Sequence, residues 1–330
     1  MNRAALIAYA NANLTARAAV PASLLVPSYY SNPTTSDAAK APSEQDTYNV
    51  AVFARAYLYT KDQRYLDAIT GILGNWAATC TSVSTSGDTP LVVCYHWYKV
   101  FEAITLVAKA SPTAAVVMAT QIGPFATQKL LPAFQSIAHD FNNWQSWSIF
   151  AQVKLGLMQL AVGAASSVDL AGLKAQISTH LTRSTIDFPF INRPHEFWTE
   201  NLRGNNSLRY THFSLGPLLL ADKALGGGED FLPYITAFAG NCRNPSGYYG
   251  RYGTSSWLGH ITKLFASSSA TPELPDPTSW SGEFFYYATL VGYSGFSDLY
   301  LPNTTFNVGP GGELLYFVEN DAELGLLKVT

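Results

Sequence analysis

The sequence reads YNVAVFARAYLYT over residues 48–60 and QRYLDAITGILGNWAATC over residues 63–80. In both stretches apolar residues recur at intervals of three and four, which is the period of an amphipathic α-helix. Only the short segment TKDQ (60–63) connects the two periodic stretches. Because so short a connection makes two helices antiparallel neighbours, this part of the chain predicts a helical hairpin.

The hairpin pattern recurs along the chain, which favours an all-helical fold. Further helices are predicted at the following ranges: 94–110, 111–131, 144–165, 167–183, 207–225, 229–240, 254–267 and 279–293. Repeated hairpins either stack into an open solenoid or close into a toroid, and the weak similarity between these hairpins argues against a regular solenoid.

We therefore predict a single all-α domain over residues 1–330, an (α/α) toroid formed as an incomplete barrel of helical hairpins. The segments at 31–46 and 267–282 are rich in Pro, Gly and Ser, and we interpret them as loops. The C-terminal ELLYFVENDAELGLLKV (313–329) is a candidate for a small β-hairpin.

The composition points to a globular protein that handles sugars. Hydrophobic residues make up 48% of the 330 residues, whereas charged residues make up only 13%, about half the usual share. The 19 Tyr and 7 Trp offer flat apolar faces with a hydrogen-bonding tip. A net charge of −3 provides no basic field for nucleic acid, so an anionic polysaccharide would have to be met by local cations.

The remaining class signals are weak. No apolar run approaches the length of a membrane span, and the N-terminus is a poor signal peptide. We expect a secreted or periplasmic protein, so either a signal peptide has been trimmed or the protein is exported by another route.

The spacing of the three cysteines includes no CxxC pattern. Two interpretations of Cys80 and Cys94 stay open: they form a disulfide, or they are buried thiols. No metal or cofactor is implied, and we expect a monomer.

Residues 141–150, FNNWQSWSIF, place two asparagines at the start of a strong helix. Asp140, Asn142 or Asn143 is suited to cap this helix by accepting a backbone N–H. Since one cap residue is enough, the second amide remains for another task, such as holding a substrate.

A second polar stretch, ENLRGNNSLRYTHFSL, begins at Glu200. Arg203 and Tyr210 are seven residues apart, nearly two helical turns, so on a helix both side chains would point the same way. In one interpretation Arg203 only pairs with Glu200 and Tyr210 packs in the core. In the other, both side chains serve a reaction.

That reaction is β-elimination in a uronate polymer. The proton on C5 leaves, and the bond from C4 to the bridging oxygen breaks. The carboxylate beside C5 opposes the developing charge, and neutral donors together with a cation remove this resistance. Asn143 and Arg203 are suitable donors, and a tyrosine near an arginine can act as base and then as acid.

At these residues the chain resembles the alginate lyases of polysaccharide lyase family five and related uronan lyases. That family carries Asn-Asn-His on one helix, and later an Arg followed seven residues on by a Tyr; here the match is Asn142, Asn143 and Trp144, then Arg203 and Tyr210. The resemblance implies an (α/α) toroid, with Asn143 and Arg203 neutralising the carboxylate and Tyr210 as base and acid.

The departure lies at Trp144, where the family has its histidine. In mannuronate and glucuronate the C5 proton and the C4–O bond lie on one side, so one tyrosine can serve both transfers. Losing the histidine therefore predicts a syn-eliminating enzyme for polymannuronate or glucuronan, and the alternative that His195, His212 or His96 replaces the lost base stays open. Further candidates for substrate contacts are Asn142 and the aromatic and histidine positions Trp144, Trp147, His96, His195, His212 and Tyr30.

Two other functions remain open. An inverting glycoside hydrolase on the same toroid would need two carboxylates facing each other across a cleft. The available acids are Glu44, Asp46, Asp140, Glu196, Glu200 and Glu283, and no pair has a diagnostic spacing. A non-catalytic glycan-binding module would need neither acids nor a proton-transferring tyrosine.

Overall fold

The computed structural model describes residues 2–138, 141–184, 195–201, 203–252, 272–301 and 318–325. By internal contacts the chain divides into two compact units. Unit 1 comprises residues 1–139, 147–173 and 309–312, and unit 2 comprises residues 140–146, 174–308 and 313–330. The expectation of one domain over residues 1–330 stays a prediction.

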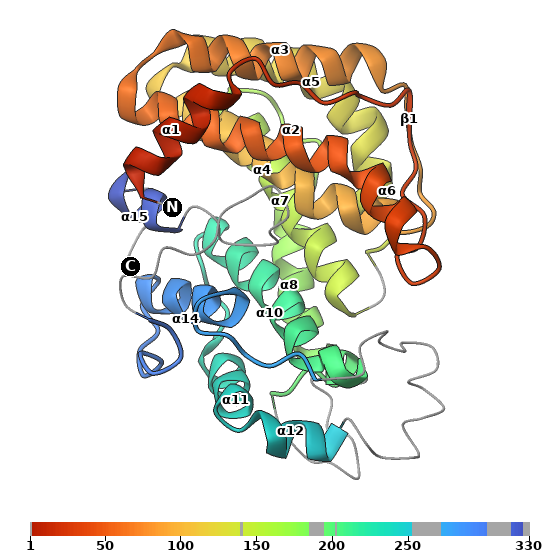
Figure 1. Ribbon diagram of the computed structural model, residues 1–330, viewed down its shortest axis with the longest axis vertical. Helices are drawn as coiled ribbons and strands as arrows, with labels where there is room; N and C mark the ends of the chain where they lie inside the picture. The colour runs from red at the N-terminus through yellow and green to blue at the C-terminus, as the bar shows by residue number, and fades with distance from the viewer. Residues whose placement is uncertain are drawn as a thin grey trace. The chain divides into compact units, whose positions relative to one another are not determined.

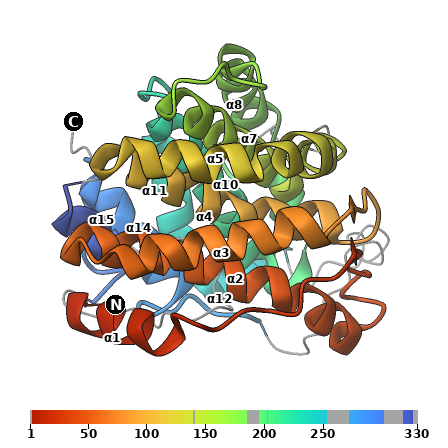
Figure 2. The ribbon, with the colours of Figure 1, turned by 90° about the horizontal axis from the view of Figure 1, so that it is seen from above.

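Unit 1 consists of long helices that lie side by side (Figures 1 and 2). Its helices are α1 (Arg3–Asn13), α2 (Pro33–Thr60), α3 (Gln63–Thr79), α4 (Thr89–Ala110), α5 (Pro112–Phe125), a π-helical turn (Ala126–Leu130), α6 (Leu131–Gln135) and most of α7 (Asn143–Ala161). Helix α2 packs on α3 and α4, and α5 packs on the same two helices. At the turn between α2 and α3, Lys61 has a φ of 62° and its N–H donates to the Tyr57 carbonyl. The hairpin predicted at 48–80 is confirmed.

Helix α2 begins fifteen residues earlier than the periodicity indicates, at Pro33 rather than residue 48. The Asn32 side chain caps it by accepting from the Thr35 N–H at 3.1 Å. The polar residues that resemble a loop have partners inside the protein. Asp46, for instance, is fully buried and accepts from Trp76 Nε1 at 2.8 Å and from the Ala18 N–H at 3.1 Å. Burial of these satisfied polar groups explains why the loop prediction for 31–46 is wrong.

The segment after α3 settles the cysteine question. Strand β1 (Ser23–Leu24) pairs in parallel with β2 (Ser82–Val83). Cys80 and Cys94, which flank this segment, are both free and buried, so the disulfide interpretation is wrong. Helix α4, which carries Cys94, is the one helix in the described part of the chain that is long and apolar enough to cross a membrane, and 72% of its apolar window is buried inside the protein, as in a core helix.

A cluster of three charges links α2, α4 and α7 within unit 1. Glu102 accepts from Arg55 Nη2 at 2.9 Å and from Lys154 Nζ at 2.6 Å, and the Arg55 side chain is fully buried. Burial by itself would raise the pKa of Glu102, but the two cations hold it well below its usual range.

We expect Glu102→Gln to lower the free energy of unfolding by about 2 kcal/mol at pH 7, because it leaves Arg55 buried without its counter-charge. The loss is smaller than for a fully enclosed pair, since Glu102 and Lys154 are partly exposed. Because the folded-state pKa is depressed, the wild-type contribution is present above about pH 4.5 and is lost as the pH falls further. Urea denaturation at pH 7 and pH 3 tests this: the difference between the two proteins should shrink at pH 3, and a constant difference would contradict it.

Unit 2 is centred on α10 (Ser207–Ala224), which packs against α9 (Trp198–Asn201), α11 (Leu232–Arg243) and α14 (Trp280–Leu290). Its other helices are most of α8 (Leu170–Ser184), the 3₁₀ turn Gly204–Asn206, α12 (Pro245–Tyr252) and α15 (Val318–Glu323). Aromatic side chains on α11 and α14 form its core, with Phe238 stacked on Phe285 at 5.4 Å.

Two sequence predictions in this unit need comment. Residues 318–323 of the candidate C-terminal hairpin are helical, so the hairpin is wrong there, and the rest of 313–329 lies mostly outside the described residues. The helix predicted at 254–267 also lies outside them. The helices predicted at 207–225, 229–240 and 279–293 are confirmed with small shifts at their ends.

Candidate functional site

The first turn of α7, in unit 2, is capped by Asn142. Its Oδ1 accepts from the Trp144 N–H at 2.8 Å, and its carbonyl accepts from the Ser146 N–H at 3.1 Å. The preceding Phe141 has a φ of 45°, and its N–H donates to Gln145 Oε1 at 3.0 Å. The cap predicted near residue 142 is therefore confirmed, and the Asn143 side chain is left for another task.

A buried hydrogen-bond chain ties this turn to α8 and α10. Gln145 Oε1 also lies 2.9 Å from His180 Nδ1. Since an amide oxygen can only accept a hydrogen bond, Nδ1 carries the proton. His180 Nε2 is then the acceptor facing the Ser146 hydroxyl at 3.2 Å, and Ser146 lies 2.9 Å from Ser214. Burial lowers the pKa of His180 to about 3, so the ring is neutral. No pattern in the sequence predicts this hydrogen-bond chain, because α7, α8 and α10 are distant from one another in the sequence.

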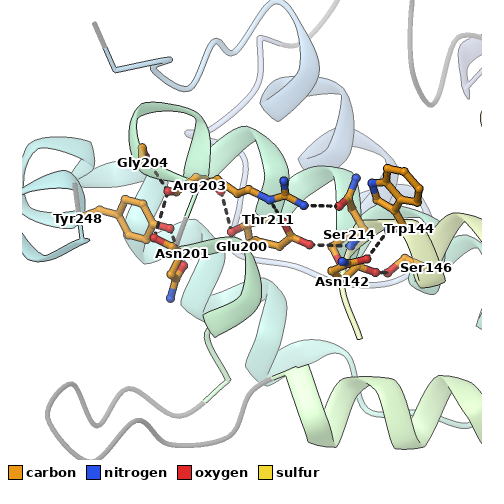
Figure 3. Close-up of polar contacts among 12 residues, drawn as sticks. Asn142, Trp144, Ser146, Glu200, Asn201, Arg203, Gly204, Thr211, Ser214 and Tyr248 are labelled. Atoms are coloured by element: carbon orange, nitrogen blue, oxygen red, sulfur yellow. Dashed lines mark hydrogen bonds and ion pairs between the residues drawn. The ribbon is translucent and has the colours of Figure 1, made fainter. Parts of the chain in front are cut away.

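Asn143, Glu200 and Arg203 form a closed ring of hydrogen bonds, of which Figure 3 labels Glu200 and Arg203. The Asn143 N–H donates to Glu200 Oε1 at 2.6 Å, and Arg203 Nε donates to Glu200 Oε2 at 3.2 Å. The ring closes where Arg203 Nη2 donates to Asn143 Oδ1 at 3.1 Å. Asn143 and Glu200 are fully buried, and Arg203 is only 6% exposed.

This ring decides which way the Asn143 amide points. A guanidinium only donates, so the amide atom that faces it must be the oxygen. The Nδ2 donor then points elsewhere and has no hydrogen-bond partner within the described residues. Leaving a buried donor unsatisfied costs about 1–3 kcal/mol. A bound molecule that supplies an acceptor for Asn143 Nδ2 would remove this cost.

Tyr210 lies directly against the cation. The Arg203 Cζ is 4.5 Å from the centre of the Tyr210 ring, and the two residues are held by the turn at Gly204 and the first turn of α10. Gly204 has a φ of 60°, a left-handed conformation that turns the chain between Arg203 and the helix. The guanidinium therefore makes a cation–π contact with this ring.

The structure thus brings together Asn142, Asn143, Arg203 and Tyr210, all within unit 2. Trp144 follows Asn143 in the same turn and is half-buried (Figure 3). The pairing of Arg203 with Glu200, which the simpler interpretation predicted, is also confirmed. Tyr210 is half-buried, so its packing in the core is not confirmed, and a reaction role for Arg203 and Tyr210 stays a prediction.

Other predicted contact residues are buried elsewhere. In unit 1, His96 is fully buried beside the Ser43 hydroxyl at 3.1 Å, and Trp147 is fully buried against the rings of Tyr95 and Tyr98. In unit 2, His212 is 2% exposed between aromatic rings of α14. Whether these three side chains contact a substrate stays a prediction.

The last two predicted contact residues are exposed. His195 in unit 2 has a φ of 68° and packs edge-on against Tyr234, with ring centres 5.1 Å apart. Tyr30 in unit 1 is 47% exposed and packs edge-on against Tyr29. Their roles as substrate contacts stay predictions.

The helical hairpins define a class of all-α proteins, and comparison with solved structures identifies the fold more closely. The chain is similar to two structures of alginate lyase A1-III, each complexed with a tetrasaccharide. In one, a histidine is replaced by alanine: the TM-score is 0.55 at 13% identity, over 76% of this chain and 79% of the other. In the second, a tyrosine is replaced by phenylalanine: the TM-score is 0.60 at 13% identity, over 89% of this chain and 88% of the other.

The likeness establishes the fold. Alginate lyase A1-III is an (α/α) toroid, so the predicted fold class is confirmed, as is the structural resemblance to family five over most of the chain. No family model matches the sequence, and no curated protein matches it.

Proposed function

We propose that this protein is a polysaccharide lyase that cleaves a β-1,4-linked uronate polymer by β-elimination. The carrying observation is the Asn143 Nδ2 donor, which is buried, unpartnered within the described residues and oriented by the bond from Arg203 to Asn143 Oδ1. A neutral donor beside a guanidinium is suited to a carboxylate, the group that must be neutralised before C5 can lose its proton.

The proton transfers fall to Tyr210. As phenolate it takes the C5 proton, the electron pair forms the C4–C5 double bond, and the C4–O bond breaks. The phenol then returns the proton to the departing oxygen, so the tyrosine is regenerated. The Arg203 guanidinium, whose Cζ lies 4.5 Å from the centre of the Tyr210 ring, places a positive charge beside this proton-transferring residue.

For the substrate we propose polymannuronate first and glucuronan second. Trp144 stands where the family has a histidine suited to a proton on the opposite face, and indole is not a base at ordinary pH. A single tyrosine serves sugars whose C5 proton and C4–O bond lie on the same side. The tetrasaccharide bound by alginate lyase A1-III supports a polysaccharide as substrate, which in turn favours action outside the cell.

Of the alternatives, the hydrolase is less well supported. Glu200 is held by two donors in the Asn143 ring, and Asp46 is held by Trp76 and the Ala18 N–H, so neither is placed as a solvent-facing acid or base. A non-catalytic glycan-binding module would share the carboxylate site but would not turn over.

A panel of polymannuronate, polyguluronate, glucuronan and hyaluronan, read by ultraviolet absorbance, tests the proposal. Elimination leaves an absorbing C4–C5 double bond, whereas hydrolysis gives reducing ends without it. We expect absorbance to grow fastest with polymannuronate, more slowly with glucuronan, and not with polyguluronate. New reducing ends without absorbance, or binding without either signal, would overturn the lyase assignment.

A further inference from the structure

Glu200 is a buried acid in contact with both proposed carboxylate-binding residues. Its two oxygens accept from different partners: Oε1 from the Asn143 N–H, and Oε2 from Arg203 Nε. Because both of its oxygens are already held by protein donors, Glu200 acts through the groups that it holds.

The bond to the Asn143 N–H satisfies a second backbone donor at the start of α7. The first four N–H groups of a helix have no intrahelical acceptor. Asn142 serves the Trp144 N–H, and Glu200, from the distant helix α9, serves the N–H of Asn143, the first residue of α7. A negative charge at this helix end is also favoured by the helix dipole. Glu200 thus sets the position of the Asn143 backbone.

The bond to Arg203 sets the guanidinium. An arginine side chain has several rotatable bonds, and ordering them costs conformational entropy. Here the Nε edge is held by Glu200 and the face lies against Tyr210, so Nη2 is directed at Asn143 Oδ1. The direction of the Asn143 Nδ2 donor depends on that last bond.

We propose that Glu200 is a positioning residue that determines which edge of the Asn143 amide is presented to a substrate carboxylate. This inference rests on the proposed lyase function for the identity of the ligand. Without the Glu200 carboxylate, Arg203 is released from its Nε contact, and the amide is free to turn its oxygen toward the incoming anion, which would repel it.

Burial and charge agree with this role. Burial raises the pKa of Glu200, while Arg203 and the Asn143 N–H oppose that rise by stabilising the ionised form. Within the described residues, the ionised acid is stabilised by the donors of Asn143 and Arg203. Removing the Glu200 carboxylate therefore changes the hydrogen bonding of Asn143 and Arg203 directly.

The substitution Glu200→Gln removes the negative charge of the side chain and keeps its size and shape. The glutamine oxygen can still accept from the Asn143 N–H, but its NH₂ group would meet the Arg203 Nε–H donor to donor. We expect kcat/KM on polymannuronate to fall about 100-fold, with most of the loss in kcat, because charge at C5 develops only in the transition state. As a matched control, Asp298→Asn removes the acid of an exposed pair with Arg243 and should leave kcat/KM within about two-fold.

A second measurement does not depend on enzymatic activity, on a substrate or on the Glu200→Gln variant. In wild-type protein with ¹⁵N-labelled arginine, the Nε–H of Arg203 should exchange with solvent more slowly than that of Arg243, whose bond to Asp298 is exposed. Arg203→Lys and Arg243→Lys assign the two signals. This comparison decides the outcome if Glu200→Gln does not fold.

The two proposals fail in different ways. If the wild-type protein eliminates no uronan, the lyase function is wrong, whereas the exchange of Arg203 still tests the role of Glu200. Glu200→Gln with wild-type kinetics, or an Arg203 Nε–H that exchanges as fast as that of Arg243, overturns the positioning role. Slow exchange together with the loss of kcat supports it.

Discussion

Tyr210→Phe is expected to lose about 10⁴-fold in kcat on polymannuronate, because one hydroxyl supplies both the base and the acid of the elimination. General acid–base catalysis contributes about 10²–10⁴-fold, and here no second group is proposed to share it. The ring itself stays, so its contact with the Arg203 guanidinium and the carboxylate-binding pair are retained. Binding of a mannuronate tetrasaccharide should therefore change little.

Two measurements separate chemistry from binding in this variant. Ultraviolet absorbance follows turnover, and calorimetry with the tetrasaccharide follows affinity. Tyr249→Phe is a matched control in the same unit, since it removes a hydroxyl that donates to the Glu273 carbonyl and costs about 1 kcal/mol of stability without touching the ring of hydrogen bonds. Normal activity in Tyr210→Phe would show that the role of the tyrosine is assigned wrongly.

His212→Phe is expected to stabilise the protein, with a margin that widens in acid. His212 is buried between Trp280 and Phe284, and neither ring nitrogen has a hydrogen-bond partner within the described residues. Replacing an unsatisfied buried imidazole by a phenyl ring should raise the free energy of unfolding by about 1–3 kcal/mol at pH 7.

The acid dependence follows from the direction of the pKa shift. Burial, assisted by the Arg209 charge, lowers the pKa of His212 from 6.5 to about 3. Below pH 6.5 the unfolded chain takes up a proton that the folded protein does not, so wild-type stability falls as the pH falls. The advantage of His212→Phe should therefore grow by about 1.4 kcal/mol per pH unit below 6.5.

Urea denaturation of both proteins at pH 7, 6 and 5 measures this margin. Comparing the two chains cancels other groups, including the buried His180, which acts in the same direction, and Glu200, which acts in the opposite one. Phe284→Leu, a core change without a titrating group, should lower the whole curve and keep its slope. A margin that is independent of pH would contradict the neutral buried state of His212.

Local pattern was a reliable guide to the helices and to part of the site. The three-and-four spacing at 48–80 predicts the α2–α3 hairpin, and the seven-residue step from Arg203 to Tyr210 predicts two side chains that point the same way. Their contact comes from the turn at Gly204, which lies before the helix. Local pattern was a poor guide at 31–46, where the residues resemble a loop but most of them belong to α2. The polar side chains of Ser43 and Asp46 have buried hydrogen-bond partners there, which the local pattern does not record.

The sequence by itself determined the all-helical class and the capped start of α7, since periodicity and capping are local properties, whereas the carboxylate site stays a prediction from residue type and family resemblance. Only the tertiary structure decided that Glu200 joins Asn143 to Arg203 and that Trp147, His96 and His212 are buried. The physical reason is that burial and the acceptor for a given donor depend on helices distant in the chain, which no local spacing records.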